Sequence, residues 1–320
     1  MVHTGARMNR LSLLLRRNWG VSALFLVLAV AYLVQVLTSP VDKSAQARYH
    51  ITATHLHQLS LAIALPYIVI WVVGLVSYLW LRSYTTFLGK DKDAAGFRTL
   101  TRGVFLMTFW LPASTLAAGL ASNYYWHHPD ATAALIRTVN YLNIILLLPA
   151  FWWVYKGADQ LLAAAKIPRI GLTPRQVSVF IAFAALYVFL TFHDSSRLVA
   201  AESSIKATYY LTDWWILFTI VIPRLLMWYL GFAAASSVIL YRRRVKGAIY
   251  KEALQFVALG LTGIVCATIV LRIVQSLSAQ LIKLSLPALF LIVYALLALI
   301  AVGYVLLAKG ASRLQKIEES

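Results

Sequence analysis

Eight long runs of apolar residues constrain the fold of this chain more than any other feature of its sequence. A membrane-spanning α-helix needs roughly 20 such residues. The runs lie near residues 20–38, 58–81, 103–121, 138–155, 176–193, 214–240, 253–275 and 285–308. Because lipid offers no hydrogen bonds to an open backbone, continuous apolar segments of this length cross a bilayer as helices, not as the alternating strands of a barrel. The sequence predicts an all-α integral membrane protein with eight transmembrane helices.

An internal repeat groups these helices in two sets. The segment 63–103 matches the segment 220–260 without a gap, at an offset of 157 residues. The residues that coincide include rare types, namely Pro66 with Pro223, Trp71 with Trp228, Gly74 with Gly231, Tyr84 with Tyr241 and Gly103 with Gly260. Chance is a poor explanation for rare residues in such register, so the offset indicates two copies of one unit.

The same three-residue sequence, Lys-Gly-Ala, lies near the end of each predicted copy, at 156–158 and again at 309–311. We therefore predict a first four-helix repeat over residues 1–157 and a second over 158–320, within one integral membrane domain. An even number of spans per copy means that both copies enter and leave on the same side. They are then parallel repeats, related by an axis along the membrane normal.

The net charge of +18 is unevenly distributed along the chain. Of the 29 Lys and Arg residues, 21 precede the first span or follow the even-numbered spans. The positive-inside rule places these segments and both termini in the cytoplasm, so that we predict a multi-pass protein of the cytoplasmic (inner or plasma) membrane. Short loops without a recognition module favour anionic lipid headgroups, not nucleic acid, as the partner of this charge.

The repeated residues of the second and sixth spans predict closely packed helices. They are Pro66, Trp71 and Gly74 in the second span and Pro223, Trp228 and Gly231 in the sixth. The tryptophan and glycine of each set share one helix face, where glycine admits a neighbouring helix and the indole fills the space beside it. Each proline removes a backbone donor and favours a kink. We predict packing or hinge positions, with a kinked pathway as the functional alternative.

Arg224 is the sharpest chemical feature of the sequence. It lies about ten residues inside the outer boundary of its span, hence roughly 15 Å deep, and no span core offers Asp or Glu to neutralise it. A charge at this depth faces protein or water, and Trp228 is placed to cover it. Tyr67 holds the matching position in the first copy, while Arg272 adds a cation nearer the outer end of the seventh span. We predict that these four residues bind an anionic solute; the alternative is a structural role.

Histidines on the predicted outer side are the weaker candidates for a site. His55, His57 and His193 could act as zinc or copper ligands, but neither His-x-x-x-His nor His-Glu-x-x-His occurs. The sequence therefore predicts no cofactor, and an outward-facing metal or haem redox protein is the third functional alternative.

The favoured function is transport or binding of a small solute, preferably anionic, at the interface of the two repeats. The chain lacks the motifs of serine hydrolases, zinc proteases and phosphate-binding loops, which disfavours an enzyme. The alternative from a different class is a non-catalytic membrane scaffold or subunit of a larger complex, with protein partners in the membrane.

Overall fold

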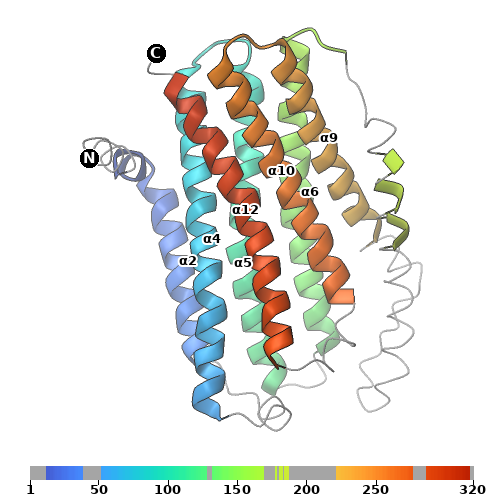
Figure 1. The fold of residues 1–320 in the computed structure, drawn as a ribbon. Helices are drawn as coiled ribbons and strands as arrows, with labels where there is room; N and C mark the ends of the chain where they lie inside the picture. The colour runs from blue at the N-terminus through green and yellow to red at the C-terminus, as the bar shows by residue number, and fades with distance from the viewer. Residues whose placement is uncertain are drawn as a thin grey trace.

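The computed structural model of the chain is helical in the part that it describes (Figure 1). That part comprises residues 12–38, 52–127, 132–168, 221–276 and 286–317, together with most of 177–186. No strand occurs within these ranges, in agreement with the all-α prediction. The long helices are α2 (Trp19–Thr38), α4 (Ala53–Phe87), α5 (Ala94–His127), α6 (Thr132–Ala164), α9 (Ile222–Arg244), α10 (Ala248–Ser276) and α12 (Leu286–Ile317).

Five helical stretches of the described chain are long and apolar enough to cross a membrane. They are Trp19–Thr38, Ala64–Phe87, Ile222–Arg244, Ala248–Val270 and Tyr294–Ile317. The prediction of an all-helical, multi-pass membrane protein is confirmed at this level. α5 and α6 cover the third and fourth predicted spans. The fifth predicted span, 176–193, falls mostly outside the described residues, so eight spans in two sets of four remain a prediction.

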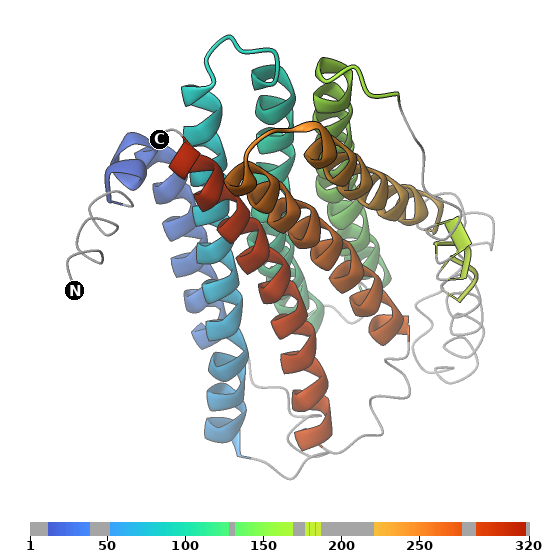
Figure 2. The same cartoon turned by 45° about the horizontal axis from the view of Figure 1, so that its top comes forward.

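Six of these helices form a closed ring, and α2 lies outside it. Around the ring the packed neighbours follow chain order, from α4 through α5, α6, α9 and α10 to α12, which packs back against α4. The most extensive contacts join α5 to α6 and α10 to α12. α2 packs against α4 and α5, and both views show it on the outer flank of α4 (Figures 1 and 2).

The basic segments gather at one end of the ring, which is the upper end in Figure 1. α4, α6, α9 and α12 end there, whereas α5 and α10 begin there. Arg82, Arg98 and Arg102 belong to this basic end, as do the arginine run 242–244 and Lys309. The grouping agrees with the single side on which the sequence placed most of the positive charge.

Two glycines form the tight turns at the basic end. Gly89, between α4 and α5, has a φ of 55°, and Gly247, between α9 and α10, has a φ of 96°. Both values lie in the left-handed region, which glycine enters without the steric cost that a Cβ imposes. The other end of α4 is capped by Thr52, whose side chain accepts a hydrogen bond of 3.3 Å from the His55 backbone nitrogen.

Glycines also permit the closest helix crossings within the ring. At Gly103 of α5, an added Cβ would lie 2.7 Å from the backbone nitrogen of Val154 in α6. At Gly260 of α10, an added Cβ would lie 2.6 Å from the backbone nitrogen of Leu307 in α12. Because these neighbours are backbone atoms, no rotamer change can make room. The two tightest pairs of helices in the ring therefore each depend on a glycine.

A second pair of glycines lies where helices of the two predicted halves meet. An added Cβ on Gly74 of α4 would lie 3.4 Å from the Tyr304 ring of α12. An added Cβ on Gly231 of α9 would lie 3.1 Å from the Phe151 ring of α6. The nearest atoms to these added Cβ atoms belong to Thr108 of α5 and Val265 of α10, and an aromatic ring from the other predicted half lies just beyond them.

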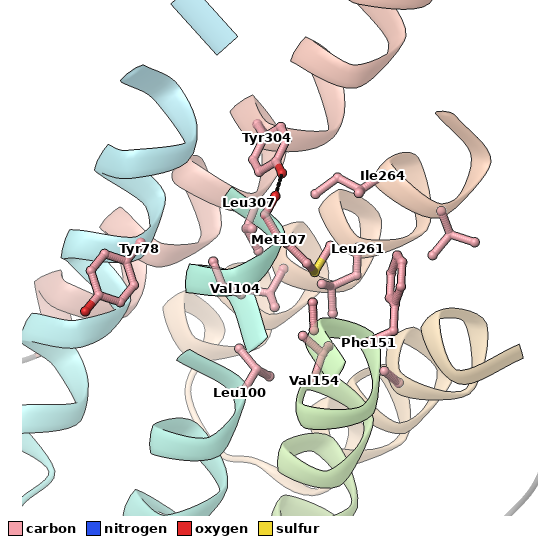
Figure 3. Close-up of a cluster of buried hydrophobic side chains, with 14 of the residues drawn as sticks. Tyr78, Leu100, Val104, Met107, Phe151, Val154, Leu261, Ile264, Tyr304 and Leu307 are labelled. Atoms are coloured by element: carbon pink, nitrogen blue, oxygen red, sulfur yellow. Dashed lines mark hydrogen bonds between the residues drawn. The ribbon is translucent and has the colours of Figure 1, made fainter. Parts of the chain in front are cut away.

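The centre of the ring is filled by apolar side chains (Figure 3). The cluster comprises Leu100, Val104 and Met107 from α5, Phe151 and Val154 from α6, Leu261 and Ile264 from α10, and Tyr304 and Leu307 from α12. Its polar contact is the Tyr304 hydroxyl, which donates a 2.6 Å hydrogen bond to the Met107 carbonyl. At this level the space between the predicted halves is packed with hydrocarbon.

Candidate anion-binding site

A pocket of about 410 Å³ lies between α4, α5 and α6 near the basic end. Its lining consists of Tyr78, Arg82 and Thr85 from α4, of Arg98, Thr101, Arg102, Phe105 and Leu106 from α5, and of Trp153 from α6. Three of these nine residues are arginines and none is acidic. The pocket therefore combines positive charge with an aromatic and aliphatic lining.

Helix periodicity explains why these residues meet. The lining positions of α4 are spaced i, i+4 and i+7, and those of α5 are spaced i, i+3, i+4, i+7 and i+8. Each set forms one stripe on its helix. α4 and α5 are antiparallel neighbours, joined by the turn at Gly89 (Figure 1). Their two stripes form walls of the pocket.

The pocket has a buried floor and a charged rim. Tyr78, Thr85 and Thr101 are buried, whereas the three arginines are exposed. The two threonine hydroxyls donate to carbonyls of their own helices, at 2.7 Å in each case. The charged donors for a ligand therefore come from the arginines at the rim.

Two of the arginines are positioned by aromatic side chains of the lining. Arg82 Nη1 donates a 3.1 Å hydrogen bond to the Tyr78 hydroxyl. The Arg102 guanidinium lies 5.4 Å from the centroid of the Trp153 ring, within the range of a cation–π contact. A guanidinium has five N–H donors in a planar fork, so one hydrogen bond leaves most of them for a carboxylate or phosphate.

The residues that the sequence singled out lie elsewhere. Arg224 belongs to the first turn of α9 and is only 6% exposed. α9 begins partway along the ring in Figure 1, away from the basic end, which agrees with a deep position. Trp228 is buried one turn later, and neither side chain is without an interaction partner. Arg224 does not line the arginine pocket.

The matching residues of the first half form an aromatic group with α2. The Tyr67 and Trp71 rings lie 6.4 Å and 5.1 Å from the Tyr32 ring. Trp71 is 2% exposed, and its indole nitrogen has no hydrogen-bond partner among the described residues. This group packs α2 against α4.

The two prolines occupy different places in their helices. Pro66 lies inside α4, as expected from the sequence. Pro223 lies in the first turn of α9 as described, where a helix needs no N–H donor from it. A kink at Pro223 would require a helix that continues into residues before 221, which lie outside the described chain.

The remaining candidates are only partly described. Arg272 and His57 belong to α10 and α4, but their side chains are not described, and His193 lies outside the described residues. His55 sits in the first turn of α4, with its Nδ1 3.4 Å from the Thr52 hydroxyl. Within the described chain, no three His, Cys, Asp or Glu side chains gather to hold a metal.

A polar cluster at the basic end went unnoticed in the sequence. The Tyr241 hydroxyl donates a 2.5 Å hydrogen bond to Asp93 Oδ2 and lies 3.3 Å from the Tyr250 hydroxyl. At the offset of 157 residues, Asp93 matches Tyr250, and Tyr84 matches Tyr241. These contacts connect the start of α5 to α9 and α10, and thus join the two predicted halves.

The sequence does not predict the arginine pocket, because its three arginines follow an apolar run and have the pattern of loop charges. The helices α4 and α5 extend beyond the apolar runs and carry these charges into the packed bundle. The i, i+4 spacing of Arg98 and Arg102 was the available signal. No protein-family model matches the chain, and no curated protein or solved structure is significantly similar to it.

Proposed function

We propose that this membrane protein binds a small anionic ligand in the pocket between α4, α5 and α6. The observation that carries the proposal is the convergence of Arg82, Arg98 and Arg102 on one pocket whose lining includes no carboxylate. Arginine forks match the planar or tetrahedral oxygens of carboxylates and phosphates, and a charge-assisted hydrogen bond contributes roughly 1.5–3 kcal/mol. Loss of one guanidinium is then expected to weaken binding by about tenfold or more.

The proposed position of the site in the membrane follows from charge. The pocket lies at the basic end, which the positive-inside rule assigns to the cytoplasm together with both termini. We therefore propose a ligand that reaches the protein from the cytoplasm or from the cytoplasmic leaflet. Anionic headgroups around Lys90 and Lys92, in the turn between α4 and α5, would hold the same end at the membrane surface.

We also propose that the protein consists of two parallel four-helix repeats, 1–157 and 158–320. Support comes from matching contacts: Gly103 meets α6 at Val154 as Gly260 meets α12 at Leu307. The crossed contacts of Gly74 with Tyr304 and of Gly231 with Phe151 are those that a two-fold axis along the helices would produce. The arginine pocket belongs to the first repeat alone.

A role for Arg224 is part of the proposal as a second, deeper cationic position. Its burial, and its place away from the basic end, suit an anion that passes between the repeats. Trp228 and Arg272 are proposed to line the same route, whereas Tyr67 packs against Tyr32 of α2 outside the ring. The apolar cluster of Figure 3 fills the interface at its own level, so such a route must pass beside that cluster.

A membrane scaffold or complex subunit is the second candidate function. The packed apolar centre between the predicted halves favours it, because a solid core serves a structural part better than a conduit. A scaffold does not require an arginine-lined pocket. The two candidate functions therefore predict different results for the purified protein, because only a ligand-binding protein is expected to carry a bound anion.

Native mass spectrometry of the protein in a neutral detergent distinguishes them. The variant Arg82→Gln/Arg98→Gln/Arg102→Gln removes the pocket charge. The matched control Arg243→Gln/Arg244→Gln/Lys246→Gln removes the same charge from exposed positions at the same end. We expect wild type and control to carry an anionic small molecule that the pocket variant lacks. Equal occupancy of all three, or none in wild type, would overturn the proposal and favour a scaffold.

A further inference from the structure

We infer that the ligand of the arginine pocket is an anionic phospholipid, whose headgroup lies on the arginines and whose apolar part lies on Tyr78, Phe105 and Leu106. The inference rests on the proposed function and adds the chemical class of the ligand. Basic pockets between transmembrane helices are a recurrent means of holding anionic headgroups. In this protein the arrangement of polar and apolar lining along the helices points to such a ligand.

Polarity changes in the same direction along both walls of the pocket. α5 runs away from the basic end, and its lining passes from Arg98 and Arg102 to Phe105 and Leu106, over about 12 Å of helix. α4 runs toward the basic end, so Arg82 lies about 6 Å nearer that end than Tyr78. Charge therefore lies toward the aqueous phase on both walls, and apolar surface lies deeper. A lipid in its leaflet has the same order of groups.

The apolar part of the pocket continues into an aromatic ladder that runs along α5, away from the basic end, to α2 outside the ring. The Phe105 ring lies 5.0 Å from the Tyr78 ring and stacks on Phe109 at 6.1 Å. Phe109 in turn meets Phe25 of α2 edge-on at 6.5 Å. This ladder extends the apolar surface along α5 to a helix that is itself largely lipid-exposed. An acyl chain of a bound lipid would therefore contact apolar side chains along this ladder.

The rim has the composition of a membrane interface. Arg102 covers the Trp153 ring, and the neighbouring Trp152 is 49% exposed. Tryptophan and arginine are placed together where acyl chains give way to headgroups. The pocket volume of about 410 Å³ falls in the range of organic ligands, which is roughly 300–1,000 Å³. A free phosphate would use the rim and leave the apolar lining without a partner.

The second predicted repeat lacks this site. At the offset of 157 residues, the three arginines correspond to Ile239, Gln255 and Leu259. Three basic residues at that end of the second repeat, Arg242, Lys309 and Arg313, have partners in the protein. Arg313 forms an ion pair with Glu252, and its guanidinium lies 5.1 Å from the Phe256 ring centroid. One such lipid per chain is therefore expected.

The test compares three probes on purified protein freed of endogenous lipid: phosphatidylglycerol, phosphatidylcholine and inorganic phosphate. Binding is measured by native mass spectrometry as each probe is titrated. The pocket variant is Arg98→Gln/Arg102→Gln, and the control of equal charge is Arg243→Gln/Arg244→Gln. A third variant, Leu106→Gln, alters the apolar wall and keeps every charge. All changed side chains are exposed or half-buried, which favours folded variants, and circular dichroism verifies helix content.

We expect wild type and control to bind one phosphatidylglycerol, with at least tenfold weaker binding in the arginine variant and weaker binding in Leu106→Gln. Phosphatidylcholine is expected to bind more weakly, and phosphate not to compete. Competition by inorganic phosphate, with Leu106→Gln unaffected, would overturn the lipid inference and leave the anion-binding function intact. Equal phosphatidylglycerol binding by the arginine variant and the control, or equal binding of the two lipids, would also overturn the inference. If neither anionic probe binds to the wild-type protein, both the lipid inference and the proposed anion-binding function are overturned.

Discussion

Gly260→Ala is expected to destabilise the protein by about 2 kcal/mol. The added methyl group would lie 2.6 Å from the Leu307 nitrogen and 2.9 Å from the Gly303 oxygen, so α10 and α12 must separate. Overpacking costs about 1–3 kcal/mol, and the upper value applies because backbone atoms cannot rotate away. Alanine gains about 1 kcal/mol over glycine in helix propensity. A cost of about 3 kcal/mol less this gain leaves about 2 kcal/mol.

Reversible unfolding in mixed micelles, with SDS as the denaturant, measures this change. The chain holds ten tryptophans, so intrinsic fluorescence reports unfolding, and circular dichroism provides a second probe. Gly20→Ala is the matched control, because an added Cβ at Gly20 has no neighbour within 4 Å. It is expected to leave stability unchanged or to raise it by at most about 1 kcal/mol.

Gly103→Ala extends the test to the proposed repeat. Its Cβ would lie 2.7 Å from the Val154 nitrogen, so a loss of about the same size is expected. If Gly260→Ala behaves like Gly20→Ala, the helices are not as close as the argument requires. If the variants at Gly103 and Gly260 differ by more than about 2 kcal/mol, which is the full width of the range for overpacking, the two crossings are not equivalent.

Two further predictions concern transport and topology. Arg224→Leu is expected to fold and to keep its pocket ligand, but to lose anion flux in reconstituted vesicles. Arg224→Lys is expected to keep part of the flux, because lysine retains the charge without the planar fork. Unchanged flux in Arg224→Leu would exclude Arg224 from the route. A cysteine at position 245 in a Cys266→Ser background is expected to resist membrane-impermeant maleimide in intact cells and to react after lysis, and rapid reaction in intact cells would reverse the assigned orientation.

Helix type and approximate position could be predicted from the sequence, because long apolar runs allow few structures in lipid. The ends of the helices could not. α4 and α5 continue past their apolar runs into charged sequence, since contacts with neighbouring helices hold these extensions. Arg98 and Arg102 were therefore assigned to a loop and not to the wall of a pocket.

The glycines show a second limit of sequence reasoning. The repeat identified Gly74 and Gly231 as packing positions, but one sequence cannot name the partner helix. The nearest side chains are those of Thr108 and Val265, in the next helix of the chain. The rings of Tyr304 and Phe151, far away in the chain, lie just beyond them. Periodicity gives the face of a helix and leaves open what covers it. The same limit applies to Arg224, whose depth was accessible from the sequence and whose neighbours were not.

The positions at which the two halves agree and differ fall on different surfaces of the helices. Glycines and aromatic residues recur at helix crossings, where a change would force backbones apart. The walls of the pocket do not recur, since Arg82, Arg98 and Arg102 have uncharged counterparts. Arginines cost free energy in a membrane unless they reach water, headgroups or a ligand. Three of them on one pocket are not needed to pack α5 against α6, because α10 and α12 cross closely at Gly260 without arginines at the matching positions. A function confined to one half explains their presence better than stability does, and this makes the pocket the first place to test.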